Sequence, residues 1–487
     1  MRRAFDQQRR LDCSSVRELR LNLNCRDEII PILRALQHLY SRPQLRDEIL
    51  ELVARDVNNG SSRRRGRRGM DYWQILVLGA VRLGCNLDYD KLQNLAEEHR
   101  ALRQMMGIGD WDEETRFDWR RICDNVCLVR PQTIERINEL IVGEGHRFVP
   151  KAAERVRADS FVAETNIHYP TEASLIRDGL RMILRFASRL ASRLGLAGWR
   201  QHKHLYQQAK QLVWRIDRIA ARKGRDYQHR LRDGYRRLLE LAGRILPRAA
   251  ALVEQTTASV DLDVMAWRAE LAVFLGRTEQ VCGTARRRVL QGEQVPNEDK
   301  LFSMFEPHTQ LYKRGKAGDP VQFGRLAMIY EDAAGFVIHY QVLPRDAQDR
   351  EVVVEQTRLA QQRVAGRIRH ASFDRGFHSP ENQRELAKVV SHVCLPVTGN
   401  RQAQQQEQQA TVEFRRARKR HPGVESAIGA LQAGNGLKRC RDRSELGFER
   451  YVGLAVLGRN LQVLGKLLIR REDAACQAAH SRRRRAA

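Results

Sequence analysis

The sequence has no apolar run long enough to cross a membrane and no apolar segment behind its first residues. Its longest apolar stretches, Ile75–Val81 and Leu454–Leu457, are interrupted by Arg or Gly, well short of the roughly 20 residues that a membrane span requires. Residues 1–6 run into polar residues, whereas a signal peptide continues into an apolar segment. We therefore expect a cytoplasmic protein with no membrane partner.

Cysteine is sparse and shows no pairing pattern. The nine cysteines are scattered and odd in number, and only Cys123 and Cys127 lie close together. A gap of three residues without a second such pair does not make a zinc site. Helical spacing places both thiols on one face of a helix, so we expect them to pack in a core. The pattern predicts a reduced, cytosolic protein.

Acidic residues are in short supply. The chain of 487 residues has 59 Asp and Glu against 86 Lys and Arg, which gives a formal net charge of +27 and an isoelectric point near 10.3. Such an excess is typical of a protein with a polyanionic partner, most often nucleic acid. The alternatives are a ribosome-associated protein or one that is simply rich in Arg. The length suggests two to four domains.

Two long segments have the periodicity of helices. In residues 1–150 the spacing of apolar residues predicts short helices joined by tight turns. This arrangement is compatible with either a helix-turn-helix DNA-binding region or a dimerising bundle. Residues 172–300 predict a helical insertion, for which a solvated coiled-coil-like role is favoured over a DNA-gripping arm. Residues 471–487, with Arg482–Arg485, predict a basic disordered tail.

Strand signals flank the second helical segment. Val156–Val162 alternates with a period of two, and strands at 323–330 and 336–343 enclose a turn at Asp332–Gly335, which predicts a hairpin. A helix, a strand ending at Asp374, a helix with Ser379 as its N-cap and a strand at 389–395 follow. This order predicts an α/β (α+β) layer of the ribonuclease H type, with a mixed sheet flanked by helices.

Three carboxylates lie in local settings that suit metal-dependent DNA cleavage. Asp159 and Asp374 are expected at the carboxyl ends of strands, and Glu425 is expected in the first turn of a helix. Ligands of α/β sheets bind beyond the carboxyl ends of their strands. Taken singly, an Asp such as Asp374 before Arg375-Gly376 is more often a turn former. Likewise, an acid in the first turn of a helix, such as Glu425, more often only interacts favourably with the helix dipole. Together, in this order, the three acids predict a Mg²⁺ site.

With these residues in view, the chain resembles the DDE transposases of bacterial insertion sequences, which have a ribonuclease H-like core. Residues 62–146 look like the helical N-terminal domain of that family. The resemblance otherwise rests on Ala158–Val162 with Glu164–Thr171, on Phe373–Phe377, on Glu425–Gly429 with Gly436-Leu437, and on Ala455–Leu461.

The resemblance implies a function and a site. Asp159, Asp374 and Glu425 would hold two Mg²⁺ ions, with Mn²⁺ as a possible substitute. The enzyme would bind double-stranded DNA at the terminal inverted repeats of the transposon, hydrolyse the ends and join the freed 3′-OH to target DNA. It would act at the nucleoid as a homodimer or a larger synaptic oligomer, because the synapsis of two ends needs at least two active sites. The catalytic domain would comprise residues 151–171 and 320–470.

Two features depart from the family pattern. The stretch between Asp159 and Asp374 is lengthened by the helical insertion, and Gln432 stands where many relatives have Lys or Arg, about two turns after the Glu. Lys438 and Arg439 follow nearby.

Basic runs and a few other side chains could contact DNA. The histidines His168, His370 and His421 flank the acids and are interpreted as structural or phosphate-contacting, since metals can activate the water without a general base. Trp119 and Trp214 could stack on bases, but core positions are favoured for both. Phosphate contacts are expected from two runs, Arg63, Arg64, Arg65, Arg67 and Arg68, and Arg415, Arg416, Arg418, Lys419 and Arg420.

Two rival interpretations remain. One is a ribonuclease H-like nuclease or resolvase that cuts DNA without strand transfer. The other is a catalytically inactive DNA-binding protein derived from a transposase. The presence of all three carboxylates argues against the inactive protein, and a pure binder would bind DNA equally well with or without Mg²⁺.

Overall fold

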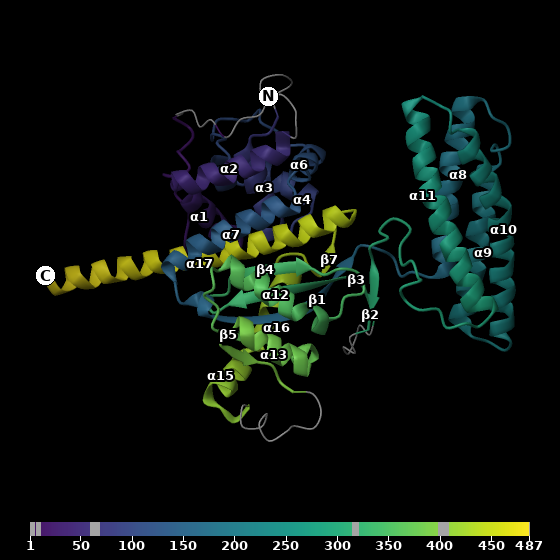
Figure 1. The fold of residues 1–487 in the computed structure, drawn as a ribbon. Coiled ribbons are helices and arrows are strands. Elements are labelled where there is room, and N and C mark those ends of the chain that lie inside the picture. The colour runs from purple at the N-terminus through teal and green to yellow at the C-terminus, as the bar shows by residue number, and fades with distance from the viewer. Residues whose placement is uncertain (1–4, 6–10, 59–68, 314–320, 398–408, 487) are drawn as a thin grey trace. The chain divides into compact units, whose positions relative to one another are not determined.

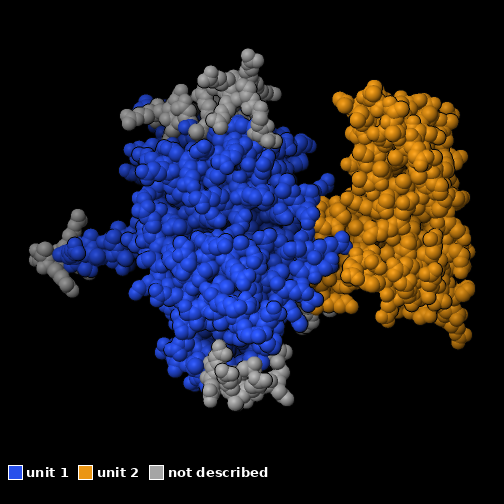
Figure 2. Space-filling model, in the orientation of Figure 1, with its two compact units in different colours: residues 1–166, 325–487 blue, residues 167–324 orange. Residues whose placement is uncertain are grey.

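The computed structural model describes residues 5, 11–58, 69–313, 321–397 and 409–486. The chain divides into two compact units (Figure 2). Unit 1 comprises residues 1–166 and 325–487, and unit 2 comprises residues 167–324. The structure is 62% helical with one mixed sheet, which confirms the expected mixture of helices and strands.

The N-terminal part of unit 1 consists of helices that begin at local capping signals. Asp88 accepts a hydrogen bond from the amide of Lys91, Asp118 accepts from the amides of Arg120 and Arg121, and Pro131 occupies the first turn of its helix. The basic run Arg63–Arg68 lies outside the described residues. The helices are α1 (Ile29–Ser41), α2 (Pro43–Asn58), α3 (Tyr72–Gly84), α4 (Tyr89–Glu98), α5 (Arg100–Met105), α6 (Trp119–Val126) and α7 (Pro131–Phe148).

The sheet of unit 1 is built around its first strand (Figure 1). The order is β3-β1-β5-β6, with β4 beside β3 and β7 beside β1. β4 is antiparallel to β3 across the expected turn, which confirms the hairpin, whereas β5 and β7 are parallel to β1 and β6 is parallel to β5. The strands are β1 (Arg155–Thr165), β3 (Gln322–Asp332), β4 (Val337–Val342), β5 (His370–Ser372), β6 (His392–Cys394) and β7 (Arg439–Cys440).

Helices flank this sheet. α12 packs on β4 and α13, α15 packs on β5 and β6, and α16 packs on β1. Ser379 caps α13 by accepting a hydrogen bond from the amide of Asn382, and Pro380 is its first residue, as expected. The bounds are α12 (Asp349–Arg363), α13 (Pro380–Val389), α15 (Val412–Arg420) and α16 (Gly423–Gly429), which continues into a π-turn at Ala430–Gly434.

The last helix, α17 (Glu445–Ala486), forms the core of unit 1 against α1, α3, α7 and β4. It is long and apolar enough to pass a compositional test for a membrane span, but 72% of its apolar window is buried inside the structure, which is typical of a core helix. The expectation of a disordered tail at 471–487 is wrong for the described residues, because α17 continues as a helix to Ala486.

Unit 2 is a four-helix bundle followed by a short strand. α8 and α10 each pack against both α9 and α11, and they also contact each other. Apolar residues at helical spacing, among them Leu180, Ile183, Leu238 and Leu271, are completely buried in its core. The helices are α8 (Glu172–Leu194), α9 (His202–Arg222), α10 (Tyr227–Gln255) and α11 (Leu262–Ala285), and β2 (Gln310–Tyr312) pairs with the first residues of β3.

Candidate active site

Two of the predicted acids lie at neighbouring positions of β1 and β5. The expectation that Asp159 ends its strand is wrong, because β1 continues beyond it to Thr165 and pairs there with β7. β1 and β5 pair in parallel with Arg155 opposite His370 and Arg157 opposite Ser372. Asp159 and Asp374 each lie two residues beyond the last of these pairs, on strands that are about 4.8 Å apart. Because side chains alternate between faces along a strand, Asp159 shares its face of β1 with Arg157. Asp374 ends the extended segment and precedes a 3₁₀ turn at Arg375–Phe377.

Glu425 lies on the helix that packs along the same strand. At Gly423, in the first turn of α16, a Cβ atom would collide with the guanidinium of Arg157. Further along, Gln432 donates a hydrogen bond from Nε2 to the carbonyl oxygen of Val162 at 3.5 Å. α16 and its π-turn therefore follow β1 from Arg157 to Val162, and Glu425 is exposed at the Arg157 end, where Asp159 also lies.

His421 lies within electrostatic reach of two of the acids. Its Nδ1 is 3.2 Å from Oγ of Ser372, the residue two positions before Asp374. Burial lowers the pKa of His421, whereas the carboxylates of Asp374 and Glu425 act to raise it and Arg157 acts to lower it. The same imidazole thus interacts with both acids, which supports their proximity.

The carboxylates of Asp374 and Glu425 are available to a ligand. Both residues are exposed. Within the parts of the chain that the structure describes, neither carboxylate forms an ion pair within 4.0 Å or a hydrogen bond. Asp159 is half-buried, and its Oδ1 accepts from the amide of Ser160 at 2.7 Å. The site therefore holds exposed oxygen donors at the end of a strand.

The donor chemistry suits a hard divalent cation. Among the described residues, no three His, Cys, Asp or Glu side chains form a cluster that could hold a metal ion. Mg²⁺ does not need such a cage, since it is usually bound by one or two carboxylates together with substrate phosphate. Asp159 and Asp374, with Glu425 on the adjacent helix, supply carboxylates of that kind.

An ion pair between the half-buried Arg157 and the buried Glu331 holds the segments next to the acids together. Arg157 donates from Nε to Oε2 of the buried Glu331 at 2.6 Å, and its Nη1 donates to the carbonyl oxygen of Arg420 at 3.2 Å. Burial raises the pKa of Glu331, and Arg157 opposes that rise. Arg157 therefore links β1, β3 and the end of α15. The alternation of Arg155, Arg157 and Asp159 is the sequence signal that could have identified this role.

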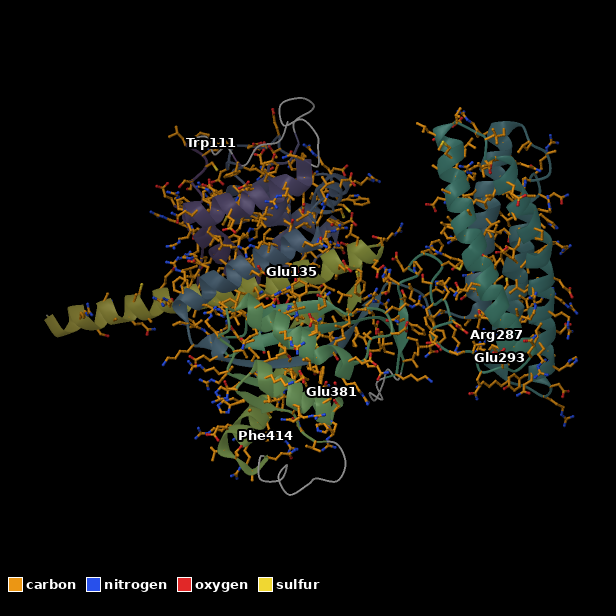
Figure 3. The ribbon with its side chains drawn as sticks, viewed as in Figure 1. Trp111, Glu135, Arg287, Glu293, Glu381 and Phe414 are labelled. Carbon is orange, nitrogen blue, oxygen red and sulfur yellow. The ribbon has the colours of Figure 1, made fainter. Side chains whose placement is uncertain are left out.

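The second predicted basic run forms one exposed helix next to the acids. Phe414 anchors α15 (Figure 3), because its side chain is buried and its carbonyl oxygen accepts from Sγ of Cys394 at 3.7 Å. The basic side chains are all exposed, and the helix ends immediately before α16. They are Arg415, Arg416, Arg418, Lys419 and Arg420.

The departure from the family pattern at Gln432 has a local explanation. The side-chain amide of Gln432 donates a hydrogen bond to the backbone of β1, as described above. Lys438 and Arg439 are exposed at β7, where Arg439 lies 3.6 Å from Glu164 of β1. A basic pair therefore flanks the far half of β1, although no basic residue occupies position 432.

The remaining candidates have other positions. The ring of His370 stacks on that of His392, with centroids 4.4 Å apart, at the start of β5. His168 belongs to unit 2, where its Nε2 is 3.5 Å from Asp178. The core positions favoured for Trp119 and Trp214 are wrong, because their exposed fractions are 37% and 57%. Amphipathic spacing does not distinguish a tryptophan at the margin of a helix face from one inside it.

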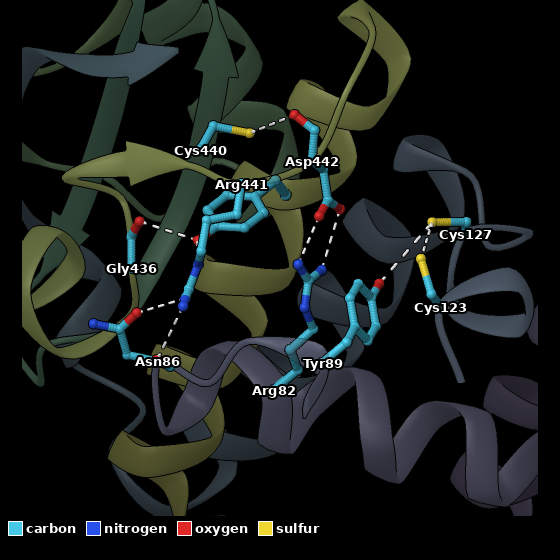
Figure 4. A network of polar contacts seen from close by, with 10 residues as sticks. Arg82, Asn86, Tyr89, Cys123, Cys127, Gly436, Cys440, Arg441 and Asp442 are labelled. Carbon is cyan, nitrogen blue, oxygen red and sulfur yellow. Dashed lines mark hydrogen bonds and ion pairs between the residues drawn. The ribbon is translucent and has the colours of Figure 1, made fainter. Parts of the chain in front are cut away.

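A polar network holds the segment after the Glu425 helix against the N-terminal helices (Figure 4). Arg82 of α3 donates to both carboxylate oxygens of Asp442, at 2.6 and 3.1 Å. Arg441 donates from Nη2 to Oδ1 of Asn86 at 2.6 Å and from Nε to the hydroxyl of Tyr451 at 3.0 Å. These contacts fix β7 and the start of α17 in unit 1.

Comparisons with known proteins bear on one part of the chain. Residues 300–461 match the family model described as the transposase DDE domain. The matched segment contains Asp374 and Glu425, while Asp159 precedes it. No curated protein and no solved structure matches the chain.

Proposed function

Given that the match over residues 300–461 supports membership of the DDE transposases, we propose that this protein is a DNA transposase. It binds the terminal inverted repeats of an insertion sequence, hydrolyses phosphodiester bonds at the ends and joins the 3′-OH to target DNA. The observation that carries the proposal is the β1–β5 register, which brings Asp159 and Asp374 to neighbouring positions beside the Glu425 helix.

The same proposal includes a ribonuclease H-like catalytic domain. The order β4-β3-β1-β5-β6, with an antiparallel hairpin on one side of β1 and parallel strands on the other, supports it. Asp159 then lies on the central strand, Asp374 follows its parallel neighbour, and Glu425 lies on a later helix. Residues 1–150 take the role of DNA-binding or dimerisation region, and the protein acts at the nucleoid in the cytoplasm.

Asp159, Asp374 and Glu425 are the residues that would hold two divalent ions. When bound, Mg²⁺ ions supply an activated water or 3′-OH and stabilise the leaving oxygen of the phosphodiester. The chain's own contribution is to fix the first two acids on a shared register and to keep the Asp374 and Glu425 carboxylates free of competing cations. Arg157 is withdrawn from them by its ion pair with Glu331.

DNA reaches these acids along basic surfaces. The exposed cations of α15 stand beside α16, so phosphates that they neutralise lie near Glu425. Arg63, Arg64, Arg65, Arg67 and Arg68 are further candidates, outside the described residues. Because two transposon ends must be cut together, we expect a homodimer or a larger oligomer in the complex with DNA.

The test uses the full chain, a labelled duplex that carries the element's own end, and a supercoiled target plasmid, with Mg²⁺, Mn²⁺ or a chelator. Substitutions Asp159→Asn, Asp374→Asn and Glu425→Gln each remove one negative charge and keep the side-chain shape. We expect each to reduce Mg²⁺-dependent cleavage and joining by on the order of 10³-fold while leaving duplex binding nearly unchanged.

Glu381→Gln is the matched control, because Glu381 is also an exposed acid in the first turn of a helix, α13 (Figure 3). We expect it to retain full activity. Cleavage retained in any one of the three variants would remove that residue from the site. Wild-type cutting without joining would establish the nuclease alternative, and binding without cutting or joining would establish the inactive DNA-binding protein.

A further inference from the structure

One side of the unit 2 bundle carries a large excess of positive charge. α9 has five Lys and Arg against a single acid, Asp217, and α10 has six Arg against three acids. By contrast α8 and α11, on the other side of the bundle, together have seven Arg against five acids. The positive charge is therefore concentrated where α9 and α10 pack together, and the DDE chemistry leaves it without a role.

A groove runs between these two helices. It is lined by two leucines, two glutamines, one glutamate (Glu240) and three arginines. The lining residues recur at three- and four-residue spacing on each helix, from Gln208 to Arg215 on α9 and from Arg237 to Arg244 on α10, so each helix presents one continuous stripe. The helices approach closely at Gly234, where a Cβ atom would lie 2.9 Å from Cγ1 of Ile216.

Two of the three arginines in the groove form no ion pair with the described residues. Arg215 and Arg244 are exposed, and over the described ranges neither has an acidic group within 4.0 Å. Arg237 forms an ion pair with Asp233 of its own helix, with Nη2 3.0 Å from Oδ2. Next to the groove, Arg218 lies 4.5 Å from the ring centroid of Trp214, which leaves that guanidinium at the surface. Cations on one stripe without acidic partners are suited to an external polyanion.

We propose that the α9–α10 groove binds the phosphate backbone of duplex DNA, as a second DNA contact separate from the three acids. This inference rests on the proposed function for the identity of the polyanion. Arg237 and Arg244 are seven residues apart, which is about 10.5 Å along the helix and corresponds to about three base-pair steps of a duplex. Guanidinium groups at this spacing can contact phosphates about three steps apart on one strand.

The test measures the salt dependence of binding by the full chain to a labelled duplex, with a chelator present so that no cleavage occurs. The slope of log affinity against log salt changes by about 0.9 for each phosphate contact. We expect Arg215→Gln/Arg244→Gln to reduce the magnitude of the slope by about 1.8. Arg215→Lys/Arg244→Lys keeps the charges and should keep most of the slope.

The control removes two charges from the other side of the same bundle. Arg181 and Arg189 of α8 lie over the rings of Phe305 and Trp267, at 5.4 and 5.8 Å. Arg181→Gln/Arg189→Gln should leave the slope unchanged. Equal slopes for Arg215→Gln/Arg244→Gln and the wild type would overturn the inference. A slope for Arg215→Lys/Arg244→Lys as small as that of the Gln variant would overturn it too. A groove effect seen with duplex RNA or single-stranded DNA but absent with duplex DNA would also overturn it.

The experiment distinguishes a failure of the groove assignment from a failure of the proposed function. If the wild-type chain cuts and joins DNA but the groove variant binds with an unaltered slope, only the groove assignment fails. If the wild-type chain does not bind duplex DNA at all, the proposed function fails first. Thermal unfolding of each variant shows whether the bundle remains folded.

Discussion

At the scale of single residues, the buried charges of unit 1 are held by several partners at once. The exposed fraction of Arg82 is 1%, and its guanidinium carbon lies 3.8 Å from the ring centroid of Tyr89 in addition to the contacts with Asp442. Burial acts to lower the pKa of Arg82, but the bonds to Asp442 outweigh it and the pKa is raised. A buried cation of this kind is tolerated only while its partners remain, because an uncompensated buried charge is strongly destabilising.

His339 is the residue through which unit 1 should respond to pH. It is completely buried on β4, with Nε2 2.8 Å from Oε1 of Gln356, and burial lowers its pKa to about 4. The unfolded chain, with an ordinary value near 6.5, takes up the proton first as the pH falls. The stability that neutral His339 provides is therefore complete above about pH 6.5 and is lost as the pH falls towards 4. We expect this residue alone to cost about 2 kcal/mol between pH 7 and pH 5.

Urea unfolding of unit 1 at pH 7 and pH 5 measures this effect. His339→Gln cannot titrate, so its loss of stability between the two values should be smaller than that of the wild type by that amount. His204→Gln, which removes an exposed imidazole of unit 2, serves as the control and should lose as much as the wild type. An identical pH dependence in His339→Gln would show that His339 is charged or accessible in the folded state.

At the scale of the elements, local signals account for most helices and for the hairpin, but not for everything that positions the site. Alternation predicts β1, and the Ser379-Pro380 pair predicts the start of α13. β7 is two residues long and exists only through its pairing with Glu164 and Thr165, so no local pattern could reveal it. The neighbouring positions of Asp159 and Asp374 likewise depend on a register of three residue pairs. Sequence order indicates which strands could meet, whereas the register follows from packing.

The close approach of α1 to α17 depends on one glycine. A Cβ atom at Gly465 would collide with the carbonyl oxygen of Pro31, and backbone cannot give way as a flexible side chain can. We therefore expect Gly465→Ala to destabilise unit 1 by about 1–3 kcal/mol through overpacking. Gly143→Ala is the control, because Gly143 is exposed in α7 with no atom within 4 Å of the added methyl. In a helix interior that change should be neutral or stabilise by up to about 1 kcal/mol. Equal urea midpoints for the two variants would contradict the packing argument.

At the scale of the whole molecule, the residues that the structure describes form two hydrophobic cores. The core of unit 2 is made from α8 to α11 and the residues that follow them, while that of unit 1 is centred on α17. The surface of unit 2 has its own ion pairs, such as Arg287 with Glu293 (Figure 3). Because each unit buries its own apolar residues, we treat them as separate cooperative units.

Calorimetry should therefore record two unfolding transitions, since cooperative two-state behaviour holds for single domains and fails for chains with several. Leu238→Ala removes a completely buried side chain of α10 and should lower one transition by about 2–5 kcal/mol. Leu83→Ala does the same in α3 of unit 1 and should lower the other. A single transition that both variants shift equally would show that the two cores unfold as one.

The placement of unit 2 within the chain also sets the order in which the protein can be assembled during translation. β1 ends at Thr165 and its sheet neighbour β3 begins at Gln322, so a ribosome adding 5–20 residues per second needs roughly 8–30 s to bring the second strand to the first. During that interval the nascent strand has no partner, whereas the bundle can already close. β5, α16 and α17 emerge later still. The newly made chain can therefore complete its second domain before the three acids of the candidate site are all present.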